Sequence, residues 1–143
     1  MEVEAAALRV ERVHKDHLGE GYTGKGFVEV SKTLNRRLTV PISVPTTGLY
    51  ALDFRYANGN GPINTSNKCA IRTLRVGATQ VGTVVLPQRG VDEWSDWGYS
   101  SPILVQLPRG KSVLVLALDP ANENMSGTVN EALLDQLRIT RIK

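Results

Sequence analysis

The chain lacks the residues that mark several large classes of protein. It has one cysteine in 143 residues, Cys69, which excludes both a disulfide framework and a cluster of thiolate metal ligands. No apolar run approaches the roughly 20 residues that span a bilayer, so no membrane partner is expected. The first ten residues, MEVEAAALRV, lack the basic and apolar regions of a signal peptide. That start fits either a cytoplasmic protein or a domain cut from a longer secreted chain.

Clustered charge and aromatic residues are also scarce. Seventeen Lys and Arg against 14 Asp and Glu leave a formal charge of +3, and the basic residues form only short pairs such as Arg36-Arg37. Nucleic-acid recognition requires a basic stripe, so no nucleic acid is expected as a partner. Aromatic residues make up 6% of the chain, and both tryptophans fall in EWSDWGY at 93–99. Exposing an indole is unfavourable, so each ring needs either a core or a ligand.

What the chain has in abundance is alternation with a period of two. Residues 48–58, GLYALDFRYAN, place Tyr50, Leu52, Phe54 and Tyr56 on one face of a strand. Similar runs occur at 36–44, 68–76, 79–86, 102–107, 111–119 and 133–142. Turn signals such as PTTG, VGAT and LPRG separate them, which is typical of an all-β fold. We therefore expect one domain over residues 1–143, a jelly-roll β-sandwich of two antiparallel sheets.

Three local features qualify this pattern. Pro41 lies inside a run, so its strand is expected at a sheet edge or with a bulge. The segment NEALLDQL has helical propensity, but it leads into β-branched residues, so 133–142 is predicted as a strand. Cys69 alternates with apolar neighbours and is expected to be a small buried hydrophobe.

Two loops, at 57–67 and 120–130, are longer than a hairpin needs and are rich in Asn. Their amide side chains suit a hydroxyl-rich ligand. Asn and Gly also satisfy left-handed turn geometry without any ligand, and the sequence leaves both interpretations open.

Catalytic motifs are not found. The two histidines, His14 and His17, flank Asp16, but no third metal ligand and no nucleophile motif such as GxSxG or HExxH accompanies them. The glycine-rich segment at 19–26, GEGYTGKG, lacks the ending of a phosphate-binding loop. We expect the histidines on a solvated loop and no enzymatic activity.

Carboxylates form the better constellation. On a strand, Glu2 and Glu4 point to the same side, which is unfavourable unless a cation lies between them. Asp135 is in register with Leu133, Leu137 and Ile139, an inward-facing row in which a carboxylate needs a partner. The first and last strands of a sandwich are often neighbours, so the three carboxylates could converge on Ca²⁺.

The same residues allow a second interpretation without metal. Glu2 and Glu4 would then belong to a solvated terminus, and Asp135 would pair with an arginine such as Arg9 or Arg138.

The order of motifs resembles the carbohydrate-binding modules of family 35 and their relatives in family 6. The motifs are Glu2-Val3-Glu4, YTGKGFV at 22–28, GLYALDFRYANG at 48–59, the pair Trp94 and Trp97, VQLPRGKSVLVLAL at 105–118, and Asn130 followed by LLDQLRI. Each motif is modest, but six in the family's order span the entire chain.

The resemblance implies a jelly-roll β-sandwich without catalytic activity. It also implies a structural Ca²⁺ held by Glu2, Glu4, a backbone carbonyl near Lys25, and Asp135. The sugar site that it implies uses Trp94, Tyr22 and Asn130.

The sequence therefore predicts a module that binds a polysaccharide or oligosaccharide beside a catalytic domain, a hydrolase or lyase, in a larger extracellular or periplasmic protein. The alternative is a structural sandwich that buttresses a catalytic domain and has no sugar site. Residues three apart on an extended backbone face opposite sides, so we expect Trp97 in the core and Trp94 as the sugar platform.

Overall fold

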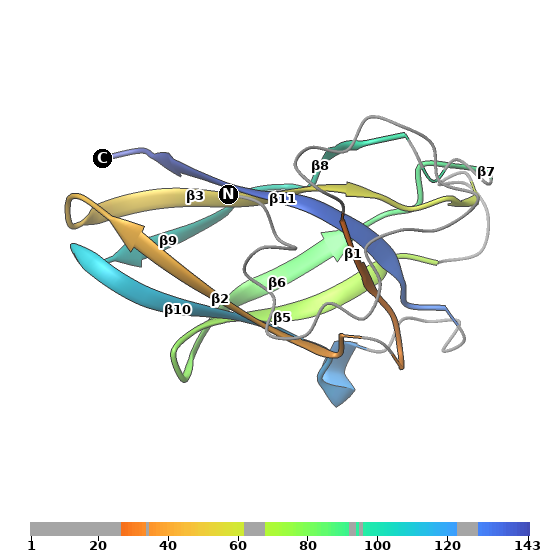
Figure 1. The fold of residues 1–143 in the computed structure, drawn as a ribbon, viewed down its shortest axis with the longest axis horizontal. Helices are drawn as coiled ribbons and strands as arrows, with labels where there is room; N and C mark the ends of the chain where they lie inside the picture. The colour runs from red at the N-terminus through yellow and green to blue at the C-terminus, as the bar shows by residue number, and fades with distance from the viewer. Residues whose placement is uncertain (1–26, 34, 62–67, 92–93, 95, 123–128) are drawn as a thin grey trace.

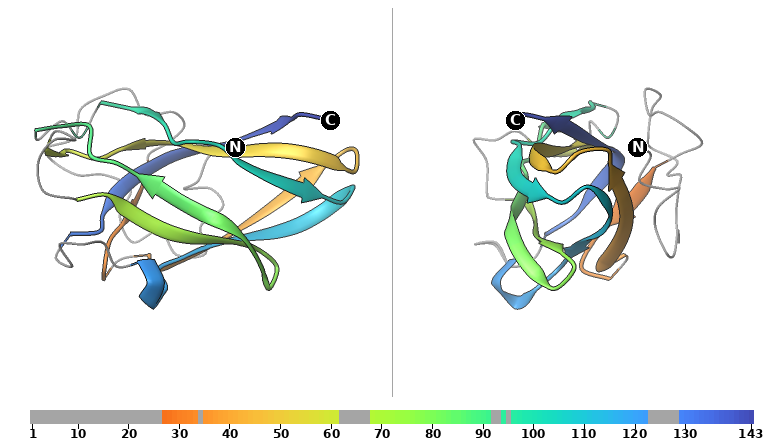
Figure 2. Two further views of the ribbon diagram at one scale, coloured as in Figure 1. Left: turned by 180° about the vertical axis from the view of Figure 1, so that it is seen from behind. Right: turned by 90° about the vertical axis from the view of Figure 1, so that its left-hand side faces the viewer.

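The computed structural model describes residues 27–33, 35–61, 68–91, 94, 96–122 and 129–143 (Figure 1). Within them, antiparallel strands form two layers that face each other, as the end view in Figure 2 shows. An all-β sandwich of two antiparallel sheets is thereby confirmed.

The first sheet has the order β1-β11-β3-β8, and β9 also pairs with β3. Its strands are β1 (Val28–Val30), β3 (Gly48–Ala57), β8 (Gly98–Tyr99), β9 (Ile103–Leu107) and β11 (Ala132–Arg141). The second sheet has the order β2-β10-β5-β6. Its strands are β2 (Arg37–Val44), β5 (Ala70–Val76), β6 (Thr79–Leu86) and β10 (Gly110–Ala117). A short pair, β4 (Asn60–Gly61) and β7 (Gly90–Val91), and the 3-10 turn η1 (Pro120–Asn122) complete the described elements.

The main core fills the space between the two sheets. The predicted row on β3, Tyr50, Leu52, Phe54 and Tyr56, is buried in it. Leu38, Val40, Ile42 and Val44 of β2 and Leu114 and Leu116 of β10 face this row from the second sheet. The alternation read from the sequence is therefore the alternation between core and outer face.

Two predictions about single strands are confirmed. The β2 strand lies at one end of its sheet's order, and Pro41 pairs only with Val113 of β10 there. An edge strand tolerates proline because one side of the strand needs no ladder hydrogen bonds. Residues 132–141 form β11, because pairing with β1 and β3 on its two sides outweighs the helical propensity of this segment.

A bulge in β11 changes one expectation. Leu134 pairs with Tyr56 and Gln136 pairs with Arg55, so Asp135 is an extra residue in the ladder. The expected single inward row of 133, 135, 137 and 139 is therefore wrong. Leu137 and Ile139 pack in or against the main core, whereas Leu133 lies in a second cluster.

That second cluster lies on the other side of the first sheet. It contains Phe27, Ala57 and Leu133, with Trp94 and Trp97 packed against it. Ala57 follows the inward-facing Tyr56, so strand alternation places Ala57 on the outer face.

Candidate functional site

Of the residues predicted for a sugar or metal site, Trp94, Asn130 and Asp135 are described. Glu2, Glu4, Tyr22 and Lys25 lie outside the described residues, as do His14 and His17. The predictions on those residues stay predictions.

Trp94 and Trp97 share one environment. Both are half-buried and both pack against the second cluster. Trp94 lies in a turn rather than on a strand, so the assumption that the two rings face opposite sides is wrong. The Trp97 ring is tilted by 52° against Phe27, with centroids 5.8 Å apart, and the Arg55 guanidinium lies 5.4 Å from its centroid. Trp97 therefore belongs to the second cluster, not to the core between the sheets.

Asn130 is buried, with 2% of its surface exposed, and lies two residues before the start of β11. Its Oδ1 accepts hydrogen bonds from the backbone N–H of Ile71 at 2.8 Å and from Nη1 of Arg72. Its Nδ2 donates to the carbonyl of Asn122 at 2.7 Å. The side chain thus links β5, η1 and the start of β11. The Nδ2 amide group has two hydrogens, and only one of them makes a hydrogen bond among the described residues. The other could donate to a ligand.

A pocket with a volume of about 290 Å³ opens beside Asn130, and most of the residues that line it are polar. Its lining is formed by Glu29, Ser31, Lys32, Thr33, Val129, Asn130 and Glu131. These residues come from β1, the segment after it, and the approach to β11, which are neighbours because β1 pairs with β11. The lining residues include two with carboxylates, one with an ammonium and two with hydroxyl groups, the types of residue that bind a polyhydroxylated ligand. Trp94 does not line it.

Arg72 contacts residues that line the pocket, and the sequence analysis did not identify it. It lies on β5 and is 1% exposed. Its Nη2 donates to the carbonyls of Ser31 at 3.2 Å and Asn130 at 3.0 Å, and its Nη1 donates to the carbonyl of Ile71 at 2.8 Å. Its Nε has no partner among the described residues. Burial, with a smaller contribution from Arg36, lowers the pKa of Arg72 to about 10.

Arg72 fixes the floor beneath the pocket. Its guanidinium binds the main chain of Ser31 and Asn130, which both line that pocket. The sequence shows Arg72 only as an arginine within the alternating run AIRTL. An arginine that faces solvent gives the same pattern, so the sequence could not predict that Arg72 supports the pocket.

Asp135 is wholly buried, and its Oδ2 lies 2.6 Å from Nη1 of Arg55. Of the two interpretations from the sequence, an arginine pair is present among the described residues, and it is formed with Arg55. Arg9 lies outside the described residues, so that alternative stays a prediction. Arg138 instead pairs with Asp53. Within the described part of the chain, no group of three or more His, Cys, Asp or Glu residues could hold a metal ion.

Cys69 is half-buried, not fully buried as expected. Its Sγ donates a hydrogen bond to Oε1 of Gln88 at 3.7 Å, and burial raises the pKa of its thiol. A protonated, hydrogen-bonded thiol is a poor nucleophile.

The chain is similar to parts of larger carbohydrate-active proteins. No family model matches it. It is 32% identical over 138 residues to a cycloisomaltooligosaccharide glucanotransferase from Niallia circulans, covering 96% of this chain and 13% of that protein. The solved structure of a Paenibacillus cycloisomaltooligosaccharide glucanotransferase complexed with cycloisomaltoheptaose matches with a TM-score of 0.73 and 30% identity. That match covers 96% of this chain and 17% of the other. The chain therefore spans a small part of these relatives.

A separate module matches over nearly its whole length. The structure of Xyl-CBM35 in complex with a glucuronic acid-containing disaccharide has a TM-score of 0.65 and 26% identity, covering 96% of this chain and 88% of that one. The chain thus has a β-sandwich fold like that of a family 35 carbohydrate-binding module, the resemblance that the motif order predicted. Among the residues that the structure describes, no helix has the length and apolar character needed to cross a membrane.

Proposed function

We propose that the chain is a non-catalytic carbohydrate-binding module that holds a larger carbohydrate-active enzyme on its polysaccharide. The observation that carries the proposal is the match to Xyl-CBM35, a module solved with a bound disaccharide, over 88% of that module's length. The relatives named for cycloisomaltooligosaccharides favour a neutral glucan as the ligand of this chain.

The pocket beside Asn130 is the best-supported place for the ligand. It has room for about one sugar residue, and its lining comes from β1 and from the segments that follow β1 and precede β11. Asn130 offers one N–H there. Trp94 does not line this pocket, so the proposed contacts of Trp94 and Tyr22 with the C–H face of a pyranose ring require a ligand that extends beyond the pocket. Binding is expected to be weak at a single site, since sugar hydroxyls must lose water to gain protein hydrogen bonds.

A structural Ca²⁺ is part of the proposal. Ca²⁺ takes six to eight oxygen ligands, and the proposed set is Glu2, Glu4, a carbonyl near Lys25, and Asp135. The described part fits this chemistry at one position, because the bulge in β11 holds a wholly buried carboxylate there. Arg55 already supplies one positive charge to Asp135, so the ion would stabilise the site by joining it to the N-terminal segment.

The partner in the parent protein would be an adjacent catalytic domain. The chain covers 13% of its glucanotransferase relative, which leaves ample length for such a domain in a similar protein. We propose an extracellular or periplasmic location for that parent, because its polysaccharide would lie outside the cell.

One observation favours a second candidate, a sandwich that supports a catalytic domain and binds no sugar. The Asn130 side chain is buried and is largely used by contacts with Ile71, Arg72 and Asn122. A glycan array with wild type and Trp94→Ala separates the two candidates. Binding by wild type that Trp94→Ala weakens supports the module, and no binding to any glycan supports the structural sandwich.

A further inference from the structure

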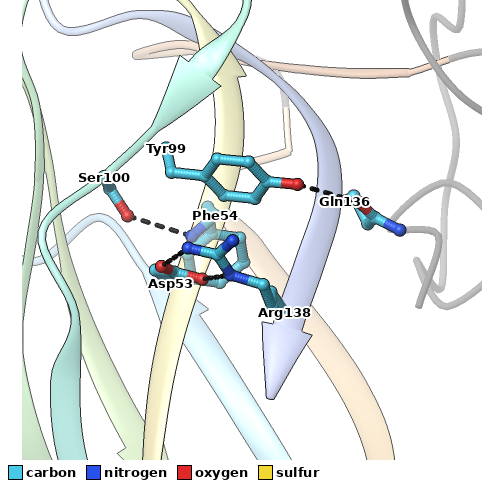
Figure 3. Close-up of polar contacts among 6 residues, drawn as sticks. All are labelled: Asp53, Phe54, Tyr99, Ser100, Gln136 and Arg138. Atoms are coloured by element: carbon cyan, nitrogen blue, oxygen red, sulfur yellow. Dashed lines mark hydrogen bonds and ion pairs between the residues drawn. The ribbon is translucent and has the colours of Figure 1, made fainter. Parts of the chain in front are cut away.

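We infer that the outer face of the first sheet carries a second saccharide site, built on Tyr99 and separate from the pocket at Asn130. The inference rests on the proposed function and extends it to a new surface. The site comprises Tyr99 of β8, Arg138 and Gln136 of β11, and Asp53 of β3, which we call the Tyr99 platform (Figure 3).

Tyr99 is an exposed aromatic side chain on a fixed backbone. It exposes 42% of its surface, and it pairs with Arg55 of β3. The next residue, Ser100, is buried and binds Phe54 through both its N–H at 2.8 Å and its Oγ at 2.9 Å. On the other side, a Cβ on Gly98 would lie 2.6 Å from the Arg89 guanidinium. The backbone that carries the ring is therefore closely packed on both sides of Tyr99.

Arg138 is held as firmly beside the ring. Its Nε and Nη2 donate to Oδ1 and Oδ2 of Asp53 at 2.9 and 2.6 Å, a bidentate pair that sets the plane of the guanidinium. The guanidinium carbon lies 3.8 Å from the centroid of the Tyr99 ring, so it covers one face. Because Tyr99 is still 42% exposed, the accessible surface belongs to the opposite face and the rim of the ring.

Two N–H groups beside this ring make no hydrogen bond to the described residues. The Tyr99 hydroxyl donates to Oε1 of Gln136 at 3.4 Å, which leaves the Gln136 amide nitrogen to donate elsewhere. The Nη1 of Arg138 likewise makes no hydrogen bond in the described part of the chain, and this side chain is 49% exposed. An aromatic face bordered by fixed N–H donors is the arrangement that binds a pyranose ring and its hydroxyls.

The local charge indicates a neutral ligand. Arg138 is matched by Asp53, and Arg55, the neighbour of Tyr99 in the ladder, is matched by Asp135. A uronate or phosphate would meet guanidinium groups whose charge is already compensated, so it would gain little over a neutral sugar. The platform therefore fits a neutral saccharide. Because the contacting groups are already ordered, binding requires little loss of side-chain entropy.

The test is a titration of the 143-residue chain with cycloisomaltoheptaose, followed by backbone amide chemical shifts in NMR. We expect two separate groups of residues to shift, one around Asn130 and one around Tyr99 and Gln136. Tyr99→Ala should weaken binding at the platform at least tenfold and leave the shifts around Asn130 intact. Tyr99→Phe, which keeps the ring, should bind within about twofold of wild type. The exposed Leu104, on β9 of the same sheet, provides the matched control, and Leu104→Ala should bind as wild type does.

The outcomes separate this inference from the proposed function. Shifts around Asn130 without shifts at Tyr99 would overturn the platform and leave the module intact. Shifts at Tyr99 alone would support the platform and remove the pocket as the sugar site. No shift anywhere with this saccharide or with dextran would overturn both. Equal weakening by Leu104→Ala and Tyr99→Ala would identify a general apolar surface, such as one covered by a neighbouring domain, and would also overturn the platform.

Discussion

Arg72 and Asn130 are joined by two hydrogen bonds inside the protein. The Nη2 of Arg72 donates to the main-chain oxygen of Asn130 at 3.0 Å, and its Nη1 donates to the side-chain oxygen. The two residues expose 1% and 2% of their surface. A buried guanidinium needs acceptors in place of water, and among the described residues Asn130 supplies both a main-chain and a side-chain acceptor. This pair positions the wall of the pocket proposed as the sugar site.

Asn130→Ala should therefore destabilise the fold. It removes the acceptor for the Ile71 N–H and for Arg72, leaving buried donors without partners, and we expect a loss of about 3 kcal/mol. Urea denaturation followed by tryptophan fluorescence measures it. The exposed Gln106 on β9 provides a control, since Gln106→Ala should change the unfolding free energy by less than about 0.5 kcal/mol. An unchanged midpoint for Asn130→Ala would show that the pair contributes little.

Removing the charge of Asp135 should weaken both the fold and its response to Ca²⁺. Asp135→Asn breaks the pair with Arg55, and we expect a loss of about 2 kcal/mol. That is less than the ~3–5 kcal/mol of a wholly buried pair, because the Arg55 side chain is 21% exposed. At a Ca²⁺ concentration 100 times its Kd, the free energy of unfolding of wild type should be about 2.7 kcal/mol higher than in EDTA. Wild type should therefore melt at a higher temperature with Ca²⁺ than with EDTA. Asp135→Asn should lose that increment. Identical melting of wild type in the two buffers would contradict the calcium proposal.

Stability should decrease in alkaline solution, partly because of Tyr56. The Tyr56 hydroxyl donates to the carbonyl of Pro87 at 2.9 Å, and burial raises the pKa of this phenol above 10.0 although Arg89 acts to lower it. A raised pKa in the folded state means that the contribution is complete below pH 10 and is lost as the pH rises above it. Tyr56→Phe should cost about 1 kcal/mol at pH 7 and flatten the decline above pH 10. Equally steep declines for the two proteins would contradict this assignment.

The contact between Gly82 and Ile103 joins the two sheets and leaves no room for a methyl group. A Cβ on Gly82 would lie 2.8 Å from Cγ2 of Ile103. Gly82→Ala should destabilise by about 1–2 kcal/mol through overpacking. Ile103→Ala removes the clashing atoms, so Gly82→Ala should cost much less in that background. A double-mutant cycle measures the difference, and additive effects would rule out the steric explanation.

Much of the fold was predictable from alternation. Every strand of five or more residues corresponds to a run identified in the sequence, because burial of one face imposes a period of two over that length. Strands β1, β4, β7 and β8 have two or three residues, too few to show a period, and they depend on pairing partners far along the chain. The bulge at Asp135 was also hidden, since the extra residue is defined only by the register of β3.

The candidate site was less predictable for a physical reason. The residue types of Trp94, Asn130 and Asp135 suggested ligands, but the sequence could not show their internal partners. Asn130 is bound by Arg72, and Asp135 is bound by Arg55, contacts that join residues 58 and 80 positions apart. An arginine on a strand is usually solvent-exposed, so the sequence pattern did not predict that Arg72 and Arg55 bind buried side chains.

Isothermal titration of the 143-residue chain with cycloisomaltoheptaose tests the central claim most directly. We expect saturable binding, with Kd on the order of 0.1–1 mM for each site, and Trp94→Ala should weaken binding at the pocket site at least tenfold while the melting temperature stays within a few degrees. Absence of binding to this ligand, to dextran and to a glucuronic acid-containing disaccharide would contradict the claim that the chain is a carbohydrate-binding module.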